Sequence, residues 1–78
     1  MPTKNANISG LAVKRYREVL GISQKDFAAR CEVQGLAFDR DTVAKIERGA
    51  RFVKDSELVT MARILECSPH DLLDWKDF

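Results

Sequence analysis

The chain has no long apolar run. Its longest uninterrupted runs of apolar side chains are three residues long, whereas a membrane-spanning helix needs about 20. The first residues, Met1–Asn5, are polar and are not followed by an apolar stretch. The sequence therefore predicts neither a membrane segment nor a signal peptide, and a cytoplasmic location is the expectation that follows.

Histidine and cysteine are also scarce, with only His70, Cys31 and Cys67 present. This set is too small for a structural zinc site, and one histidine does not allow a Ser-His-Asp or Cys-His catalytic set. No glycine-rich phosphate loop is present either. We therefore expect no enzyme, metal, cofactor or small-molecule ligand. The cysteines are expected to be small buried residues, and a disulfide or redox switch is the alternative.

What is present suits one small folded domain. The chain has 78 residues, of which 45% are hydrophobic and 32% charged. The net charge is only +1, but residues 1–54 carry eleven Lys and Arg against six Asp and Glu, whereas residues 55–78 carry two against six. Such an uneven distribution predicts one face that meets an anion. Ordinary surface charge is the alternative.

Helix start and stop signals predict five short helices and no strand. The first helix runs from about Leu11 to Leu20 and ends at Gly21, which supplies a left-handed residue. The second helix begins after the N-cap residue Ser23 and ends near Val33.

The remaining three helices follow from the same kinds of signal. Asp39 is the expected N-cap of the third helix, which Gly49 ends. The fourth helix is expected to be capped by Asp55, and the fifth starts at Ser68 with Pro69 in the first helical position. We therefore expect residues 1–8 to form a flexible N-terminal arm and residues 9–78 to form a single domain.

Apolar residues at helical spacing predict the core. They are Val13, Tyr16, Leu20, Phe27, Ala28, Cys31, Val43, Ile46, Leu58, Met61, Ala62, Leu65, Leu72 and Leu73. Between the second and third helices, either Leu36 or Phe38 is expected to reach the core. The spacing of Phe38 to Val43 matches a hydrophobic staple and favours Phe38.

The third predicted helix has two different faces. Val43, Ile46 and Glu47 fall on one side when residues are placed every 100°. The opposite side carries a row of hydrogen-bonding groups around one small residue, namely Arg40, Asp41, Ala44, Lys45 and Arg48. This row suits the major groove of DNA, where Arg and Lys donate to guanine and Asp accepts from cytosine. A solvated helix face is the alternative.

Other polar residues beside this helix suit the DNA backbone. Ser23 and Gln24 open the second helix, whose N-terminus favours an anion such as a phosphate. For Gln24, contact with a phosphate, support of a groove-facing side chain and a plain surface position all stay open. Arg51 and Lys54 follow the third helix and would flank the groove, where phosphate contacts set affinity but not sequence preference.

Two spaced motifs carry a family resemblance. They read Arg17-x-x-x-Gly21-Ile22-Ser23-Gln24-x-x-Phe27-Ala28 and Thr42-Val43-x-x-Ile46-Glu47-x-Gly49. With the pattern of the last two helices they resemble the lambda-repressor-like, Cro-type helix-turn-helix (XRE) family over about residues 9–73. The resemblance implies a compact five-helix all-α domain whose second and third helices bind double-stranded DNA.

The resemblance also implies roles for individual residues. It aligns Arg40, Asp41, Ala44 and Lys45 with base-reading positions. It aligns Gln24, Arg51 and Lys54 with phosphate contacts, to which we add Ser23 and Arg48 from their place in the pattern. It pairs Arg17 with Glu47, which would be costly to bury alone. The turn between the second and third helices departs from the family, since it is about five residues longer than the usual three or four.

The predicted function is that of a sequence-specific transcriptional regulator of the phage Cro/repressor type, with the third helix (about residues 40–48) in the major groove. A homodimer through the fifth helix and the tail residues Trp75 and Phe78 would bind paired half-sites. The alternative for these two aromatic residues is packing on their own core. The alternative function, supported by the near-neutral net charge and acidic tail, is a protein-interaction module such as an antitoxin or anti-repressor.

Overall fold

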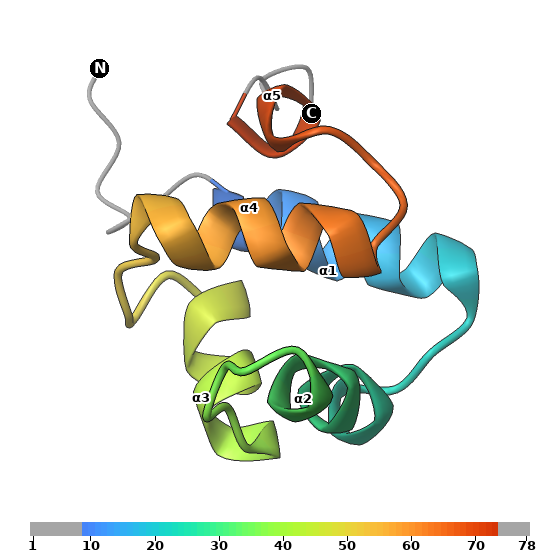
Figure 1. Ribbon diagram of the computed structural model, residues 1–78, viewed down its shortest axis with the longest axis vertical. Coiled ribbons are helices and arrows are strands. Elements are labelled where there is room, and N and C mark those ends of the chain that lie inside the picture. Colours follow the sequence, from blue (N-terminus) through green and yellow to red (C-terminus); the bar gives the residue numbers. More distant parts are fainter. Residues whose placement is uncertain (1–8, 74–78) are drawn as a thin grey trace.

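The computed structural model describes residues 9–73, which form five helices joined by short links. The helices are α1 (Ser9–Leu20), α2 (Gln24–Val33), α3 (Arg40–Glu47), α4 (Asp55–Ile64) and α5 (Pro69–Leu73). Figure 1 shows α2 and α3 together at one end, α1 and α4 across the middle, and α5 at the other end. The five-helix all-α prediction is thus confirmed, whereas the expected arm (residues 1–8) and the aromatic tail residues Trp75 and Phe78 lie outside the described residues.

The core draws side chains from all five helices. The largest fully buried side chains are Val13, Phe27, Cys31, Val43, Ile46, Met61, Leu65 and Leu72. Tyr16 and Leu20 are only partly buried against them, and the expectation that Leu73 belongs to the core is wrong, because this side chain is 57% exposed. Successive residues of a helix point about 100° apart, so when Leu72 faces the core, Leu73 turns away from it.

Local capping explains where three of the helices begin. The Ser23 hydroxyl accepts a hydrogen bond from the backbone N–H of Asp26 (3.0 Å), and the Asp39 carboxylate accepts one from the N–H of Thr42 (2.8 Å). At α5, Ser68 and Asp71 each accept a hydrogen bond from the other's backbone N–H, which is a complete capping box. These contacts satisfy N–H groups that have no partner inside the helix.

The start of α4 differs from the prediction by one residue. Lys54, with extended backbone, is the N-cap, and Asp55 is the first helical residue. The Glu57 carboxylate accepts a hydrogen bond from the Lys54 N–H at 3.0 Å. Glu57, the third residue of the helix, therefore provides the hydrogen-bond acceptor for the N–H of the N-cap residue. Asp55 is an acidic residue in the first turn, where the helix dipole favours a negative charge.

The first four helices all end in the same hydrogen-bonded arrangement. Beyond α2, the N–H of Leu36 bonds to the carbonyl of Cys31 and the N–H of Gly35 to that of Glu32, which is a Schellman motif. Equivalent pairs of bonds end α1, α3 and α4. The left-handed position is glycine after α1, α2 and α3, but it is Glu66 after α4, with φ of 62°.

The longer turn between α2 and α3 covers Gln34–Asp39. The helix α2 ends at Val33, as its sequence predicts, and the six residues 34–39 form the connection. Phe38 is buried and Leu36 partly buried at the edge of the core. The turn is therefore anchored by apolar contacts at two positions, of which Phe38, the favoured candidate, is the more deeply buried.

Both cysteines are free thiols. Burial raises the pKa of Cys31 to about 12, and burial with the nearby Asp71 carboxylate raises that of Cys67 to about 11. Because thiolates are the reactive form of cysteine, thiols that stay protonated at neutral pH are poor nucleophiles. Their position supports a packing role and not a redox switch.

Candidate nucleic-acid interface

One face of α3 is buried and the opposite face is exposed, as the helical spacing of its residues predicts. Val43, Ile46 and Glu47 are buried. The residues assigned to base contact or the adjoining backbone lie on the other side, where Arg40, Asp41, Lys45 and Arg48 are exposed and Ala44 is half-buried. The row of donors and acceptors is therefore presented to solvent by a helix whose opposite side is fixed in the core.

Asp41 and Lys45 form an ion pair one helical turn apart, with 3.5 Å between the carboxylate and the Nζ. Both side chains remain largely exposed, at 71% and 49%. Exposed pairs of this kind contribute between nothing and about 1 kcal/mol. The pair therefore orients both groups in the absence of DNA but can open at little cost when a base edge offers stronger partners.

The expected pair of Arg17 and Glu47 joins α1 to α3. Arg17 donates from Nε and Nη2 to the two Glu47 carboxylate oxygens at 2.7 and 3.1 Å, and from Nη1 to the Ile22 carbonyl at 2.8 Å. The two side chains are only 11% and 4% exposed. The hydrogen bonds to Glu47 raise the pKa of Arg17. A buried fork of this geometry orients α3 against α1 whatever its net contribution to stability.

Gln24 belongs to the same network. Its Nε2 donates to Glu47 Oε1 at 3.0 Å, so the first residue of α2 is tied to the inner face of α3. This contact is to the inward-facing Glu47 and not to a groove-facing side chain, so it is a role that the sequence analysis did not name. The three helices α1, α2 and α3 therefore meet at one carboxylate.

A hollow opens beside this network and brings in a residue that sequence reasoning missed. It is lined by Leu11, Lys14, Gln24, Ala44, Glu47 and Arg48. Lys14 is exposed on α1 and stands three residues before Arg17, a spacing that places two side chains on one helix face. That spacing was the available signal. Lys14 and Arg48 give the hollow two cations from different helices.

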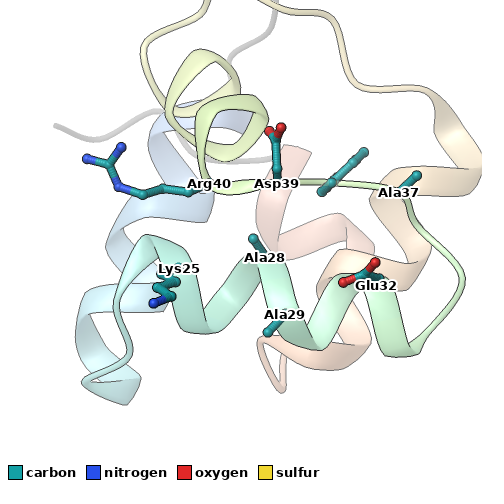
Figure 2. Close-up of a pocket in the computed structure, with 8 residues that line it drawn as sticks. Lys25, Ala28, Ala29, Glu32, Ala37, Asp39 and Arg40 are labelled. Carbon is teal, nitrogen blue, oxygen red and sulfur yellow. The ribbon is translucent and has the colours of Figure 1, made fainter.

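A second hollow, of about 330 Å³, lies between α2 and the segment that leads into α3. Figure 2 shows Lys25, Ala28, Ala29 and Glu32 along α2, beside the segment 37–40. Lys25 and Arg40 lie at one end of the hollow, close to the start of both helices. The beginning of α3 is therefore bordered by open space and by one cation from each helix.

Arg51, one of the expected phosphate contacts, lies in the link after α3 and makes several contacts within the domain. It donates to the Phe52 carbonyl (2.9 Å) and to both carboxylate oxygens of Glu57 (3.1 Å each), and its guanidinium lies 5.0 Å from the centre of the Phe38 ring. These hydrogen bonds lower the pKa of Glu57 and raise that of Arg51. Lys54, its expected companion, is exposed. Arg51 is therefore bound within the domain itself.

No cluster of potential metal ligands occurs among residues 9–73, and no helix in that range has the length and apolar character needed to cross a membrane. The site therefore consists of an exposed helix face, the cations around it, and the buried network that orients it.

Comparison with known proteins shows which family and which solved structures this chain resembles. A family model described as a helix-turn-helix domain matches residues 10–75. Among solved structures, the chain is similar to the restriction-modification controller protein C.AhdI from Aeromonas hydrophila, with 30% sequence identity, a TM-score of 0.72, and 86% of this chain and 90% of that chain covered.

Two further structures share the fold. One is the DNA-binding domain of BldD, at 25% identity and a TM-score of 0.74, covering 94% of this chain and 99% of that chain. The other is the clp gene regulator ClgR from C. glutamicum, at 20% identity and a TM-score of 0.78, covering 94% and 87%. No curated protein matches the sequence significantly. On the family match and the likeness to C.AhdI, the chain belongs to the Cro/C1-type helix-turn-helix family of DNA-binding transcriptional regulators, which is not a family of enzymes.

Proposed function

We propose that this regulator recognises a specific operator by placing α3 in the major groove of double-stranded DNA. One observation carries the proposal: the exposed row on α3 is held from behind by the buried network of Arg17, Glu47 and Gln24. A rigidly oriented helix with donors and acceptors on its outer face can distinguish base pairs by their edges. C.AhdI, named a controller protein, and BldD, named for a DNA-binding domain, support the same role.

Two of the proposed base-reading residues, Arg40 and Asp41, open α3, where recognition helices contact base edges, and Ala44 and Lys45 follow one turn later. Arg40 and Lys45 would donate to guanine, Asp41 would accept from cytosine, and Ala44 allows close approach or contact with a thymine methyl group. Their exposure and the low cost of opening the Asp41–Lys45 pair support this assignment.

The proposed phosphate contacts surround this row. They are Lys14, Ser23, Gln24, Arg48 and Lys54. The Gln24 amide has two N–H donors, so it can bind Glu47 and a phosphate at the same time. Lys14 and Arg48 line one hollow with Gln24, and the N-terminus of α2 adds the positive end of a helix dipole. Arg51 is not retained in this group, because a phosphate would have to compete with Glu57 for its guanidinium.

We also propose that the regulator binds as a homodimer through α5 and the following tail. The exposed Leu73 on α5 supports this surface, as does the position of α5 at the end of the domain away from α3 (Figure 1). Two copies joined there would present two α3 helices to half-sites about one helical turn apart. A cytoplasmic location, where such operators are found, belongs to the same proposal.

The test is a selection of binding sequences from random duplexes, followed by titration of the selected duplex at several salt concentrations. We expect a two-fold symmetric motif and an affinity that falls steeply with salt, because bound phosphates release counterions. Lys45→Ala should relax the preference at one base pair, while Arg63→Ala, which removes an exposed cation on α4 outside the proposed interface, should change nothing. Failure to enrich any sequence would contradict operator recognition and favour a protein-interaction module.

A further inference from the structure

The structure assigns Arg51 a second role in DNA recognition, one that does not require contact with DNA. We propose that Arg51, Glu57 and Phe38 form a clamp that holds the longer turn and the two ends of α3 in the orientation needed to recognise bases. In this proposal, which rests on the proposed function, Arg51 is a positioning residue and not a phosphate contact.

The clamp connects three segments that meet around α3. Phe38 directly precedes Asp39, the N-cap of α3, and Arg51 lies in the link that leaves α3. Glu57 stands in the first turn of α4, where its Oε1 also accepts the Lys54 N–H at 3.0 Å. The guanidinium thereby ties the segment before α3 and the segment after α3 to a third helix.

Arg51 contacts both of the other side chains of the clamp. Phe38 is 6% exposed, with the guanidinium lying over its ring. Glu57 is 9% exposed, and Arg51 is the cation that donates hydrogen bonds to both of its carboxylate oxygens. A buried carboxylate left without its cation is unfavourable. Moving Arg51 to a phosphate would therefore uncover an aromatic ring and leave an acidic group unpaired.

Arginine suits this role and lysine does not. The planar guanidinium makes two parallel bonds to a carboxylate and stacks on an aromatic face at the same time. A lysine ammonium keeps the charge but can do neither with this geometry. Arg51→Lys therefore separates the two possible roles, since a lysine ammonium can still bind a phosphate as a point charge.

The experiment compares four single variants of the full chain: Arg51→Lys, Glu57→Gln, Phe38→Leu and, as the matched control, Lys54→Ala. Each is titrated with the selected duplex and with a random duplex at several salt concentrations. For the first three we expect affinity for the selected duplex to fall about tenfold with the salt slope unchanged. For Lys54→Ala we expect the affinity for both duplexes to fall alike. The magnitude of the slope of log affinity against log salt concentration should fall by about 1.

The clamp is overturned if Arg51→Lys and Glu57→Gln both bind the selected duplex like the original chain. Circular dichroism under the assay conditions establishes that each variant is folded. Phe38→Leu, which removes the aromatic ring but stays apolar and keeps every charge, tests the stack even where a charge variant does not fold. If the original chain itself selects no sequence, the proposed function fails before the clamp is tested, so the two failures are distinguishable.

Discussion

Arg17 and Glu47 are thirty positions apart in the sequence and share two hydrogen bonds inside the domain. A buried ion pair is expensive to desolvate, so its net stabilisation is small, but removal of one partner leaves a charge without compensation. The pair therefore matters most for the orientation of α3. Gln24 and the Ile22 carbonyl complete the hydrogen bonding around it.

A double-mutant cycle tests this residue-scale interpretation. Arg17→Met and Glu47→Leu should each lower the free energy of unfolding by about 3 kcal/mol, because each leaves one buried charge unpaired. The double variant should lose clearly less than the sum, since it buries no charge. Urea unfolding monitored by circular dichroism provides the three values. Simple additivity would mean that the two side chains do not interact energetically.

At the scale of the helices, the residue that follows each helix affects stability. Four of the five helices end in a Schellman motif, and its left-handed position costs an L-residue about 1–2 kcal/mol that glycine does not incur. Gly35 has a φ of 94°, and Glu66 has a φ of 62° after α4. Glu66 is therefore the one strained helix end in the described residues.

Substitutions at Gly35 and Glu66 should change the free energy of unfolding in opposite directions. Gly35→Ala should lower the free energy of unfolding by about 1 kcal/mol. The added methyl group would meet no atom within 4 Å, so the cost comes from the backbone alone. Glu66→Gly should raise the free energy of unfolding by about 0.5 kcal/mol, because relief of strain is partly offset by the greater freedom of glycine when unfolded. Urea unfolding measures both; a stabilising Gly35→Ala would contradict the assignment.

The N-cap of α3 predicts a pH dependence. Hydrogen bonds from the N–H and the hydroxyl of Thr42 hold the pKa of Asp39 below its usual value. The resulting stability is present above the unfolded-state pKa of about 3.9 and is lost as the pH falls through the folded-state pKa. Asp39→Asn keeps an oxygen acceptor but does not titrate.

We therefore expect the original chain to be more stable than Asp39→Asn at pH 7 and this difference to narrow at pH 3. Thermal unfolding of both proteins at the two pH values measures it. Glu57 and Asp71, whose pKa values are also lowered, lose their contributions in both proteins and cancel in the comparison. A difference that stays constant with pH would show that the carboxylate charge of Asp39 does not stabilise the cap.

At the scale of the whole molecule, the two proposed binding surfaces lie at opposite ends. Figure 1 places α3 at one end and α5 at the other, with α1 and α4 between them. This arrangement keeps the surface that recognises DNA apart from the one that would join two copies.

The homodimer predicts a specific effect of an exposed side chain. Leu73→Glu should leave the fold intact, because the residue is 57% exposed, but should abolish cooperative occupation of paired half-sites. Val19→Glu on α1, where the side chain is 80% exposed, is the matched control and should bind like the original chain. Sedimentation and titration of duplexes with one or two half-sites measure both. Unchanged cooperativity in Leu73→Glu would remove α5 from the dimer surface.

Much of the fold could be predicted from short-range signals. Ser23, Asp39 and the Ser68–Asp71 box mark helix starts because each bonds an N–H three residues away, within the same segment. Gly21 and Gly49 mark helix ends for an equally local reason. Two helix starts differ from the prediction. Asp55 lies in the first turn of α4 and not at its cap, because aspartate suits both positions, and α1 begins at Ser9, two residues before the expected Leu11.

In the candidate site, too, the features that depend on local sequence could be predicted, whereas those that depend on distant contacts could not. The outer face of α3 and its cations follow from helical periodicity, and the pairing of Arg17 with Glu47 came from the family resemblance. The tertiary structure alone decided that Arg51 binds Glu57 and Phe38, that Gln24 turns to Glu47, and that Lys14 lines the same hollow as Arg48. The physical reason is that capping and periodicity act within one turn of helix, whereas these contacts exist only after segments distant in the chain have packed together.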